Sequence, residues 1–264
     1  MNNYLGLLSL QNIFFVIIIS LFFYKAWLYL MNKTFDNSYN EIILKATKSN
    51  EGYSNDTVIS SVFKEWWTYV ISPIEESLVV SRINPNFLTV MSFLVSFITA
   101  YLFSVGNIFS ASIVLLAGSS FDILDGRVAR INNLTSAKGA FLDSCLDRFS
   151  EIVVMFGLLV FYSSTDFIYI IYSAIAFSLT VSYVKAAAEN HGFNANVGIM
   201  QRPERVVCLG LGGLISSALE YYGFQFFGFD HLFFMLTIIF ITMLSFYATI
   251  QSTKSIKFID RLFT

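Results

Sequence analysis

The chain has 264 residues, of which 56% are hydrophobic and only 13% are charged. This balance is typical of integral membrane proteins and excludes an ordinary water-soluble fold. Sixteen basic residues against eighteen acidic ones give a net charge of -2, so the composition provides no basic surface that would favour nucleic acid as a partner.

Seven apolar runs have the length of about 20 residues that a helix needs to cross the hydrocarbon core of a bilayer. They are residues 8–31, 86–105, 108–131, 139–163, 167–188, 203–222 and 230–251. The first run lacks the basic start and the small-residue cleavage site of a signal peptide, so we interpret it as a retained span. Short polar or glycine-containing breaks follow the later runs, which favours helical hairpins. The predicted fold class is therefore all-α integral membrane.

The stretch between the first two runs divides into two parts. Residues 33–57 are polar and weakly patterned, which is typical of a cytoplasmic linker. Residues 58–80 carry apolar side chains at helical spacing and the adjacent pair Trp66 and Trp67, which favours a helix lying in the membrane interface. A cytosolic helix packed on the core fits that pattern equally well. We expect a boundary here, with an N-terminal helix and linker in residues 1–57 and the main domain in residues 58–264.

The basic residues indicate the orientation of the chain in the membrane. If the N-terminus is outside, all sixteen Lys and Arg lie in cytoplasmic segments or at the cytoplasmic ends of the helices that enter them, and the outer turns hold none. Cytoplasmic loops of membrane proteins are enriched in these residues. The sequence therefore predicts an outside N-terminus and a cytoplasmic turn at residues 131–138.

Four aspartates interrupt two neighbouring apolar runs, and they are Asp122, Asp125, Asp143 and Asp147. Carboxylates in membrane segments are costly and persist mainly where they face a cavity, a partner or a cation. Helical spacing puts each pair on one face, and the short turn between the runs makes the two helices antiparallel, so we expect the four carboxylates to converge. Donors made only of oxygen favour Mg²⁺ or Mn²⁺ over zinc. A site with two such ions suits phosphate chemistry.

Several neighbours of the aspartates allow two interpretations. Gly126, Ala129 and Gly139 leave room for a phosphate to approach the helix backbone, and they equally suit close helix packing. Arg130 fits either a phosphate contact or a boundary charge that reaches the membrane surface. Glu151 continues the line of Asp143 and Asp147, either to support the metal ligands or to solvate the helix end.

These residues form a recognisable signature. From Asp122 to Asp147 the chain matches every fixed position of D-x2-D-G-x2-A-R-x8-G-x3-D-x3-D, and it thereby resembles the CDP-alcohol phosphatidyltransferase family. Residues 84–89, Asn-Pro-Asn-Phe-Leu-Thr, also resemble the start of the first core helix of that family. The resemblance covers roughly residues 58–264. It implies a six-helix CDP-alcohol phosphatidyltransferase core, preceded here by an interfacial helix and one extra N-terminal transmembrane helix.

The resemblance also implies a reaction in phospholipid biosynthesis. CDP-diacylglycerol would bind through its diphosphate to Mg²⁺ or Mn²⁺, a hydroxyl of a polar alcohol would attack the phosphorus nearest the lipid, and CMP would leave. The implied metal ligands are Asp122, Asp125, Asp143 and Asp147, and Asp147 would also be the general base. The implied nucleotide contacts are Gly126, Ala129, Arg130 and Gly139. Family members lead us to expect a homodimer.

A basic cluster suggests a phosphorylated acceptor. Lys185, Arg202 and Arg205 are predicted on the same cytoplasmic side as the aspartates, where they would hold the acceptor's phosphate or serve only as membrane-boundary charges. The cluster resembles the subgroup that makes phosphatidylinositol phosphate or phosphatidylglycerol phosphate, and we expect inositol phosphate as the acceptor. Residues 185–189 read K-A-A-A-E where inositol phosphate enzymes often carry K-A-R-A-E. Glycerol 3-phosphate or another polar alcohol therefore stays open.

Three other classes of protein would explain part of this pattern of aspartates and basic residues. A divalent-cation transporter would place carboxylates between helices, but it would not explain the small residues, Arg130 or the basic cluster. A prenyltransferase also binds diphosphate through Mg²⁺, with its aspartate pairs at different spacing. A scaffold without activity is disfavoured because no fixed position of the signature is missing.

Overall fold

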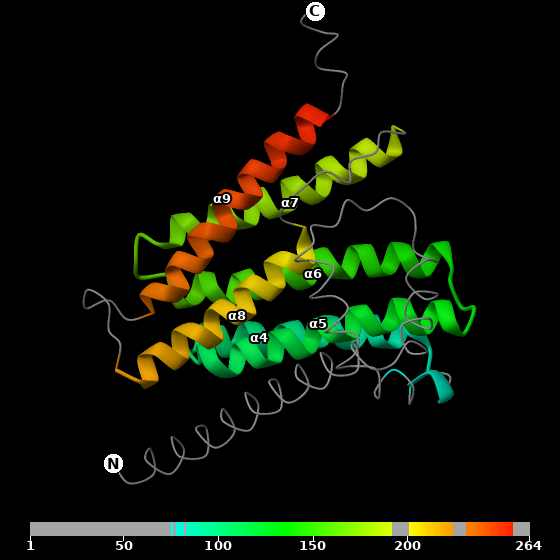
Figure 1. The fold of residues 1–264 in the computed structure, drawn as a ribbon, viewed down its shortest axis with the longest axis horizontal. Helices are drawn as coiled ribbons and strands as arrows, with labels where there is room; N and C mark the ends of the chain where they lie inside the picture. Colours follow the sequence, from blue (N-terminus) through cyan, green and yellow to red (C-terminus); the bar gives the residue numbers. More distant parts are fainter. Residues whose placement is uncertain (1–74, 76–77, 82, 192–200, 224–230, 256–264) are drawn as a thin grey trace, which may run out of the picture. The chain divides into compact units, whose positions relative to one another are not determined.

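The computed structural model describes residues 75, 78–81, 83–191, 201–223 and 231–255. Its described part belongs to one compact unit that begins at Ile74. Six helices make up this part, and no strand occurs in it. In chain order they are α4 (Pro85–Ser104), α5 (Ile108–Ile131), α6 (Ala137–Phe161), α7 (Ile168–Asn190), α8 (Arg202–Tyr221) and α9 (Leu232–Ser255) (Figure 1).

Local sequence explains where the first three of these helices begin. Asn84 caps α4 by accepting a hydrogen bond from the Asn86 backbone N–H at 3.0 Å, and Pro85 follows in the first turn. Asn107 and Ser136 cap α5 and α6 in the same way. Between α4 and α5 the chain turns at Gly106, whose φ of 76° suits a residue without a side chain.

The helices agree with six of the seven predicted apolar runs, which confirms the all-α membrane fold class and its six-helix core. The first predicted span, residues 8–31, and the linker lie outside the described residues. So does most of the predicted interfacial helix, of which residues 75 and 78–80 are described and helical. Glu75 in this segment is buried and pairs with Arg127 of α5 at 2.9 Å.

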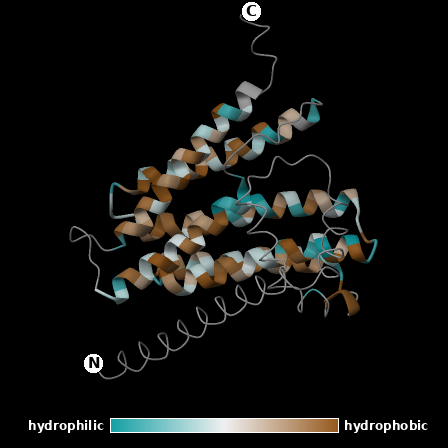
Figure 2. Cartoon of the chain, in the orientation of Figure 1, coloured by the Kyte–Doolittle hydropathy of each residue, from teal (hydrophilic) through white to brown (hydrophobic). Residues whose placement is uncertain are grey.

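Among the described residues, four helices are long and apolar enough to cross a membrane, namely α4, α5, α7 and α9. Large apolar side chains such as Phe97, Phe156 and Phe240 point outward on the bundle, as expected of side chains solvated by lipid. The chain is therefore an integral membrane protein. The helices α6 and α8 also lie at predicted spans, but they carry more charge than an apolar span tolerates. Figure 2 shows hydrophilic residues concentrated at the α5–α6 turn and at the start of α8.

The packing order of the helices decides where polar side chains can meet. The helices α5 and α6 both pack on α4 more than on each other, α8 packs on α5 and α9, and α7 packs on α9. Side chains such as Phe103, Leu158 and Ile171 fill the apolar core and are fully buried. Since α5 and α6 are not close neighbours along their length, a side chain from a third helix has room between them.

Close approach of α4 and α6 depends on Gly157. A Cβ added to this residue would lie 2.2 Å from the carbonyl oxygen of Ala100 and 2.6 Å from its Cα, so the helix backbones themselves would have to separate. Small residues at such contacts are a general device of membrane helix packing. We expect Gly157→Ala to destabilise the fold by about 1–3 kcal/mol through overpacking.

Thermal unfolding of the purified protein in detergent measures this effect. A suitable control is Gly223→Asn, because nothing lies within 4 Å of a Cβ at Gly223 and asparagine tolerates its φ of 76°. The control should unfold near the wild-type temperature. An unchanged unfolding temperature for Gly157→Ala would show that the α4–α6 contact can relax at no cost.

Candidate active site

The aspartate signature occupies the last turns of α5 and the first half of α6. Asp122 and Asp125 lie on α5, and Asp143 and Asp147 lie on α6. Asp122, Asp143 and Asp147 are partly buried, whereas Asp125 is only 4% exposed. The structure therefore places all four carboxylates at the polar end of the two helices, on the side of the α5–α6 turn.

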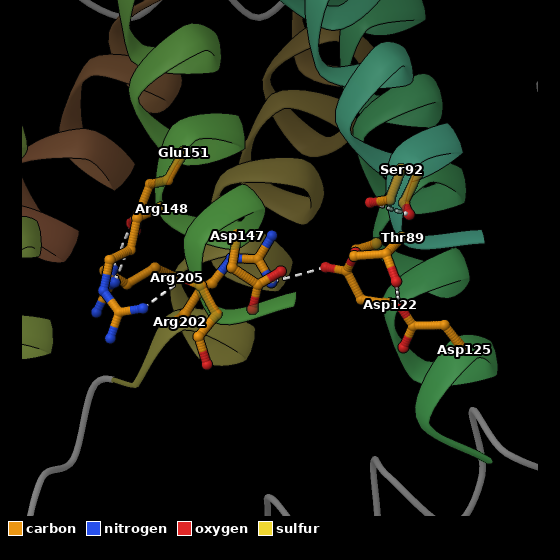
Figure 3. Close-up of polar contacts among 12 residues, drawn as sticks. Thr89, Ser92, Asp122, Asp125, Asp147, Arg148, Glu151, Arg202 and Arg205 are labelled. Atoms are coloured by element: carbon orange, nitrogen blue, oxygen red, sulfur yellow. Dashed lines mark hydrogen bonds and ion pairs between the residues drawn. The ribbon is translucent and has the colours of Figure 1, made fainter. Parts of the chain in front are cut away.

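An arginine of α8 joins the two aspartate helices. The Nη1 atom of Arg202 lies 2.7 Å from Oδ2 of Asp122 and 2.6 Å from Oδ1 of Asp147 (Figure 3). The three side chains are 15–24% exposed, so solvent screens these ion pairs only in part. Sequence reasoning assigned Arg202 to the acceptor rather than to the aspartates. The signal it lacked was the separation of α5 and α6, which leaves room for a cation from α8.

Asp125 is hydrogen-bonded to α4. Its Oδ2 accepts a hydrogen bond from Oγ1 of Thr89 at 2.5 Å, and both residues are buried. The Thr89 hydroxyl oxygen also lies 3.2 Å from the carbonyl oxygen of Pro85, so its single hydrogen is shared between the two acceptors within the first turn of α4. Thr89 was not among the predicted site residues, although it ends the segment 84–89 that the sequence analysis had singled out.

The donor set suits a hard cation, although the four carboxylates do not all meet. Within the described residues, no three Asp, Glu, His or Cys side chains form a group that could hold one metal ion. Asp122 and Asp147 nevertheless direct one oxygen each at a single positive atom, the Arg202 nitrogen. Their oxygens are the ligands that Mg²⁺ and Mn²⁺ prefer, so the residues present fit such an ion.

The predicted nucleotide residues lie around the α5–α6 turn. A Cβ at Gly126 would lie 3.3 Å from Nη1 of Arg130, so the missing side chain leaves space for this exposed guanidinium. A Cβ at Gly139 would lie 3.2 Å from Oδ1 of Asn86. Ala129 is partly buried on the same helix as Arg130. The structure thus brings Asn86, which the sequence analysis did not assign, beside the second glycine of the signature.

A pocket extends from Asp122 into the bundle between α4, α5, α6 and α8. Its wall includes Ser92 of α4, Asp122 of α5, Glu151 of α6, and Arg202 and Arg205 of α8. Two of the three predicted acceptor residues therefore line one cavity with a predicted metal ligand. Lys185, the third, is partly buried on α7 and does not line it.

Arg205 is held by Glu151 rather than directed freely into the pocket. Its Nε and Nη2 donate to the two carboxylate oxygens of Glu151 at 2.7 and 2.9 Å, and the side chains of Arg205 and Glu151 are 2% and 7% exposed. Ser178 of α7 donates a further hydrogen bond to Glu151. Of the two interpretations of Glu151, solvation of a helix end is wrong, because this carboxylate is buried and connects α6, α7 and α8 (Figure 3).

Comparison with known proteins identifies relatives of this chain among lipid synthases. The archaetidylinositol phosphate synthase of Pyrococcus horikoshii is 34% identical over 140 residues, which are 51% of this chain and 71% of that protein. The phosphatidylinositol phosphate synthase of Mycobacteroides abscessus is 29% identical over 159 residues, or 58% of this chain and 72% of the relative.

Solved structures of the Mycobacterium tuberculosis phosphatidylinositol phosphate synthase share the fold. The structure with CDP-DAG bound has a TM-score of 0.60 at 25% identity and covers 71% of this chain and 94% of the other. The structure in complex with manganese and citrate also has a TM-score of 0.60, at 26% identity, and covers 69% and 87%. The sequence model of CDP-alcohol phosphatidyltransferases matches residues 82–252. The chain is therefore an enzyme that belongs to the CDP-alcohol phosphatidyltransferase family.

Proposed function

We propose that this enzyme transfers a phosphatidyl group from CDP-diacylglycerol to a hydroxyl of inositol phosphate and releases CMP, in a reaction that requires Mg²⁺ or Mn²⁺. One observation carries the proposal: Asp122 and Asp147, from two different helices, both pair with Arg202, which lines a pocket together with Asp122 and Arg205. A site for a diphosphate-bound cation and a site for an anionic acceptor are thus adjacent. Relatives named archaetidylinositol phosphate synthase and phosphatidylinositol phosphate synthase support the choice of acceptor.

The four signature aspartates, Asp122, Asp125, Asp143 and Asp147, would hold two divalent cations. Such ions, when bound, neutralise the charge of the diphosphate and stabilise the departing CMP. Thr89 would fix the orientation of Asp125 through its hydrogen bond. The manganese in the structure of the Mycobacterium tuberculosis enzyme supports this cofactor class.

The remaining residues divide into three proposed roles. Asp147 would take the proton from the acceptor hydroxyl, because it pairs with Arg202, which lines the pocket. Gly126, Ala129, Arg130 and Gly139 would contact the cytidine nucleotide. Lys185 and Arg202 would bind the acceptor's phosphate directly, while Arg205, held by Glu151, would add positive charge to the pocket wall.

The membrane arrangement follows from the basic residues. The proposed active site faces the cytoplasm, since Arg202 and Arg205 lie with the aspartates at the polar end of the bundle. The proposed N-terminus is outside, with residues 1–57 preceding the catalytic domain 58–264. We also propose that the enzyme is a homodimer, as the family resemblance implies.

CMP release by the purified enzyme tests the acceptor. With CDP-diacylglycerol and Mn²⁺ or Mg²⁺, we expect turnover with inositol phosphate. Turnover with unphosphorylated inositol should be about 10- to 100-fold slower, because one or two charge-assisted hydrogen bonds to the phosphate are lost. Chelation of the metal should abolish the reaction.

The same CMP-release assay would also be run with glycerol 3-phosphate and with serine as acceptors. Faster turnover with glycerol 3-phosphate would assign the enzyme to the alternative acceptor that residues 185–189 leave open. Equal rates with phosphorylated and unphosphorylated alcohols would contradict the role of Lys185 and Arg202. Membership of a transferase family already disfavours a divalent-cation transporter.

A further inference from the structure

Arg202 contacts two carboxylates that come from different helices, α5 and α6. A single nitrogen of this guanidinium, Nη1, lies 2.7 Å from an oxygen of Asp122, to which it donates a hydrogen bond, and 2.6 Å from an oxygen of Asp147. Two carboxylate oxygens that converge on one atom can also contribute two of the oxygen ligands of a monatomic cation such as Mg²⁺. Arg202 thus has two partners that are both proposed metal ligands (Figure 3).

The position of Arg202 has a physical cause. Asp122 and Asp147 carry like charges in a partly buried place, and without a cation between them they would repel each other. The helices that bear them pack on α4 more than on each other, so their own contacts do little to hold the two carboxylates together. Arg202 extends from the first turn of α8 and supplies the missing positive charge.

Within the part of the chain that the structure describes, Arg202 leaves one buried donor unused, whereas the Nε of its neighbour Arg205 is hydrogen-bonded. The Nε of Arg202 is buried and has no hydrogen-bond partner among the described residues. By contrast, Arg205 uses both Nε and Nη2 on the two oxygens of Glu151. A buried N–H without a partner favours any rearrangement that gives it one. Arg202 lines the same pocket as Arg205, so such a rearrangement can direct its guanidinium toward an anion bound there.

We propose that Arg202 is the resident counter-cation of the aspartate site: its guanidinium holds Asp122 and Asp147 together before a divalent cation binds, and the two cations compete for these carboxylates. The inference rests on the proposed metal site. When a divalent cation takes the two carboxylates, Arg202 is displaced from them and becomes available to the phosphate of the acceptor. Metal loading and acceptor binding would then be coupled through one side chain.

The variant Arg202→Gln separates this inference from a purely acceptor-binding role, because no acceptor is needed in the experiment. Mn²⁺ binding is followed by electron paramagnetic resonance of the free ion, with purified protein in detergent. We expect R202Q to bind Mn²⁺ at least about fivefold more tightly than the wild type, as is usual for removal of a competing partner. In chelator, R202Q should unfold at a lower temperature than the wild type, and saturating Mn²⁺ should reduce that difference.

Arg148→Gln is the matched control. It removes the same charge from α6, one residue from Asp147, but its guanidinium donates to the backbone carbonyl of Ser144. We expect R148Q to bind Mn²⁺ much as the wild type does. If R202Q and R148Q both bind Mn²⁺ more tightly than the wild type by the same factor, the change in net charge explains the effect and the inference is overturned. Unchanged or weaker Mn²⁺ binding by R202Q would also overturn it.

Two further outcomes keep the inference distinct from the proposed function. If the wild type and R202Q both fail to bind Mn²⁺, the proposed metal site fails and the inference fails with it. If the wild type binds Mn²⁺ and R202Q binds it equally, only the inference fails. If R202Q folds only when Mn²⁺ is present, chelation of Mn²⁺ will unfold R202Q. If the same chelation leaves the wild type folded, the result supports the inference.

Discussion

The substitution Asp147→Asn is expected to lower kcat by about 10²- to 10⁴-fold, the usual contribution of a positioned general base. Asparagine keeps the size of the side chain but cannot take the proton of the acceptor hydroxyl, and it weakens the ion pair with Arg202. The rate of CMP release from CDP-diacylglycerol and inositol phosphate gives the effect on kcat. Thermal unfolding of the variant should stay close to that of the wild type, because Asp147 is partly exposed at the end of the bundle.

Asp166→Asn is the control variant, because it makes the same Asp-to-Asn change and removes the same charge outside the signature. Asp166 is exposed in the turn between α6 and α7, away from the signature, so its variant should keep the wild-type rate. A folded Asp147→Asn enzyme with a nearly normal kcat would remove Asp147 from the role of general base. In that case another group would have to accept the proton.

Breaking the Glu151–Arg205 pair should cause the largest loss of stability. Either Glu151→Leu or Arg205→Met leaves a buried charge without its partner, and such changes cost about 3–5 kcal/mol. The double variant removes both charges and replaces them with apolar side chains of similar size, so it should recover most of the loss. We would measure unfolding in detergent, by heat and by denaturant, for the two single variants and the double variant. Together these measurements give the coupling free energy between Glu151 and Arg205.

The same set of variants defines what Arg205 contributes to the reaction. If Arg205 acts mainly through Glu151, the double variant should regain stability, with an increase of KM for inositol phosphate that reflects the lost charge on the pocket wall. A double variant as unstable as the single ones would contradict the assignment of a buried pair. A stable double variant with unchanged KM would remove Arg205 from the acceptor site.

Some properties of the site were accessible from the sequence because they depend on neighbours along the chain. Asp122 and Asp125 are three residues apart and Asp143 and Asp147 are four apart, so helical periodicity alone puts each pair on one face. The lengths of the apolar runs fixed α4 to α9 to within a few residues, because the bilayer requires about 20 apolar residues for each span. The charge carried by α6 and α8 also followed from the sequence.

Other properties depend on how the helices pack, which periodicity does not specify. The turn between α5 and α6 suggested that their aspartates meet directly, but both helices pack on α4, and Asp125 is hydrogen-bonded to Thr89 there. The partner of Glu151 is Arg205, 54 residues further along the chain. No local pattern predicts such a contact, since it arises only when α6, α7 and α8 exclude water from the same place.

The sequence by itself determined the class of this protein, the positions of its described helices and the residue types of its predicted site, because membrane cost and helix geometry act locally on each segment. Only the tertiary structure decided which charges neutralise one another. Arg202 meets Asp122 and Asp147 because α8 brings a cation into the space between α5 and α6, and electrostatic pairing in a partly buried place depends on distance in space rather than on separation along the chain.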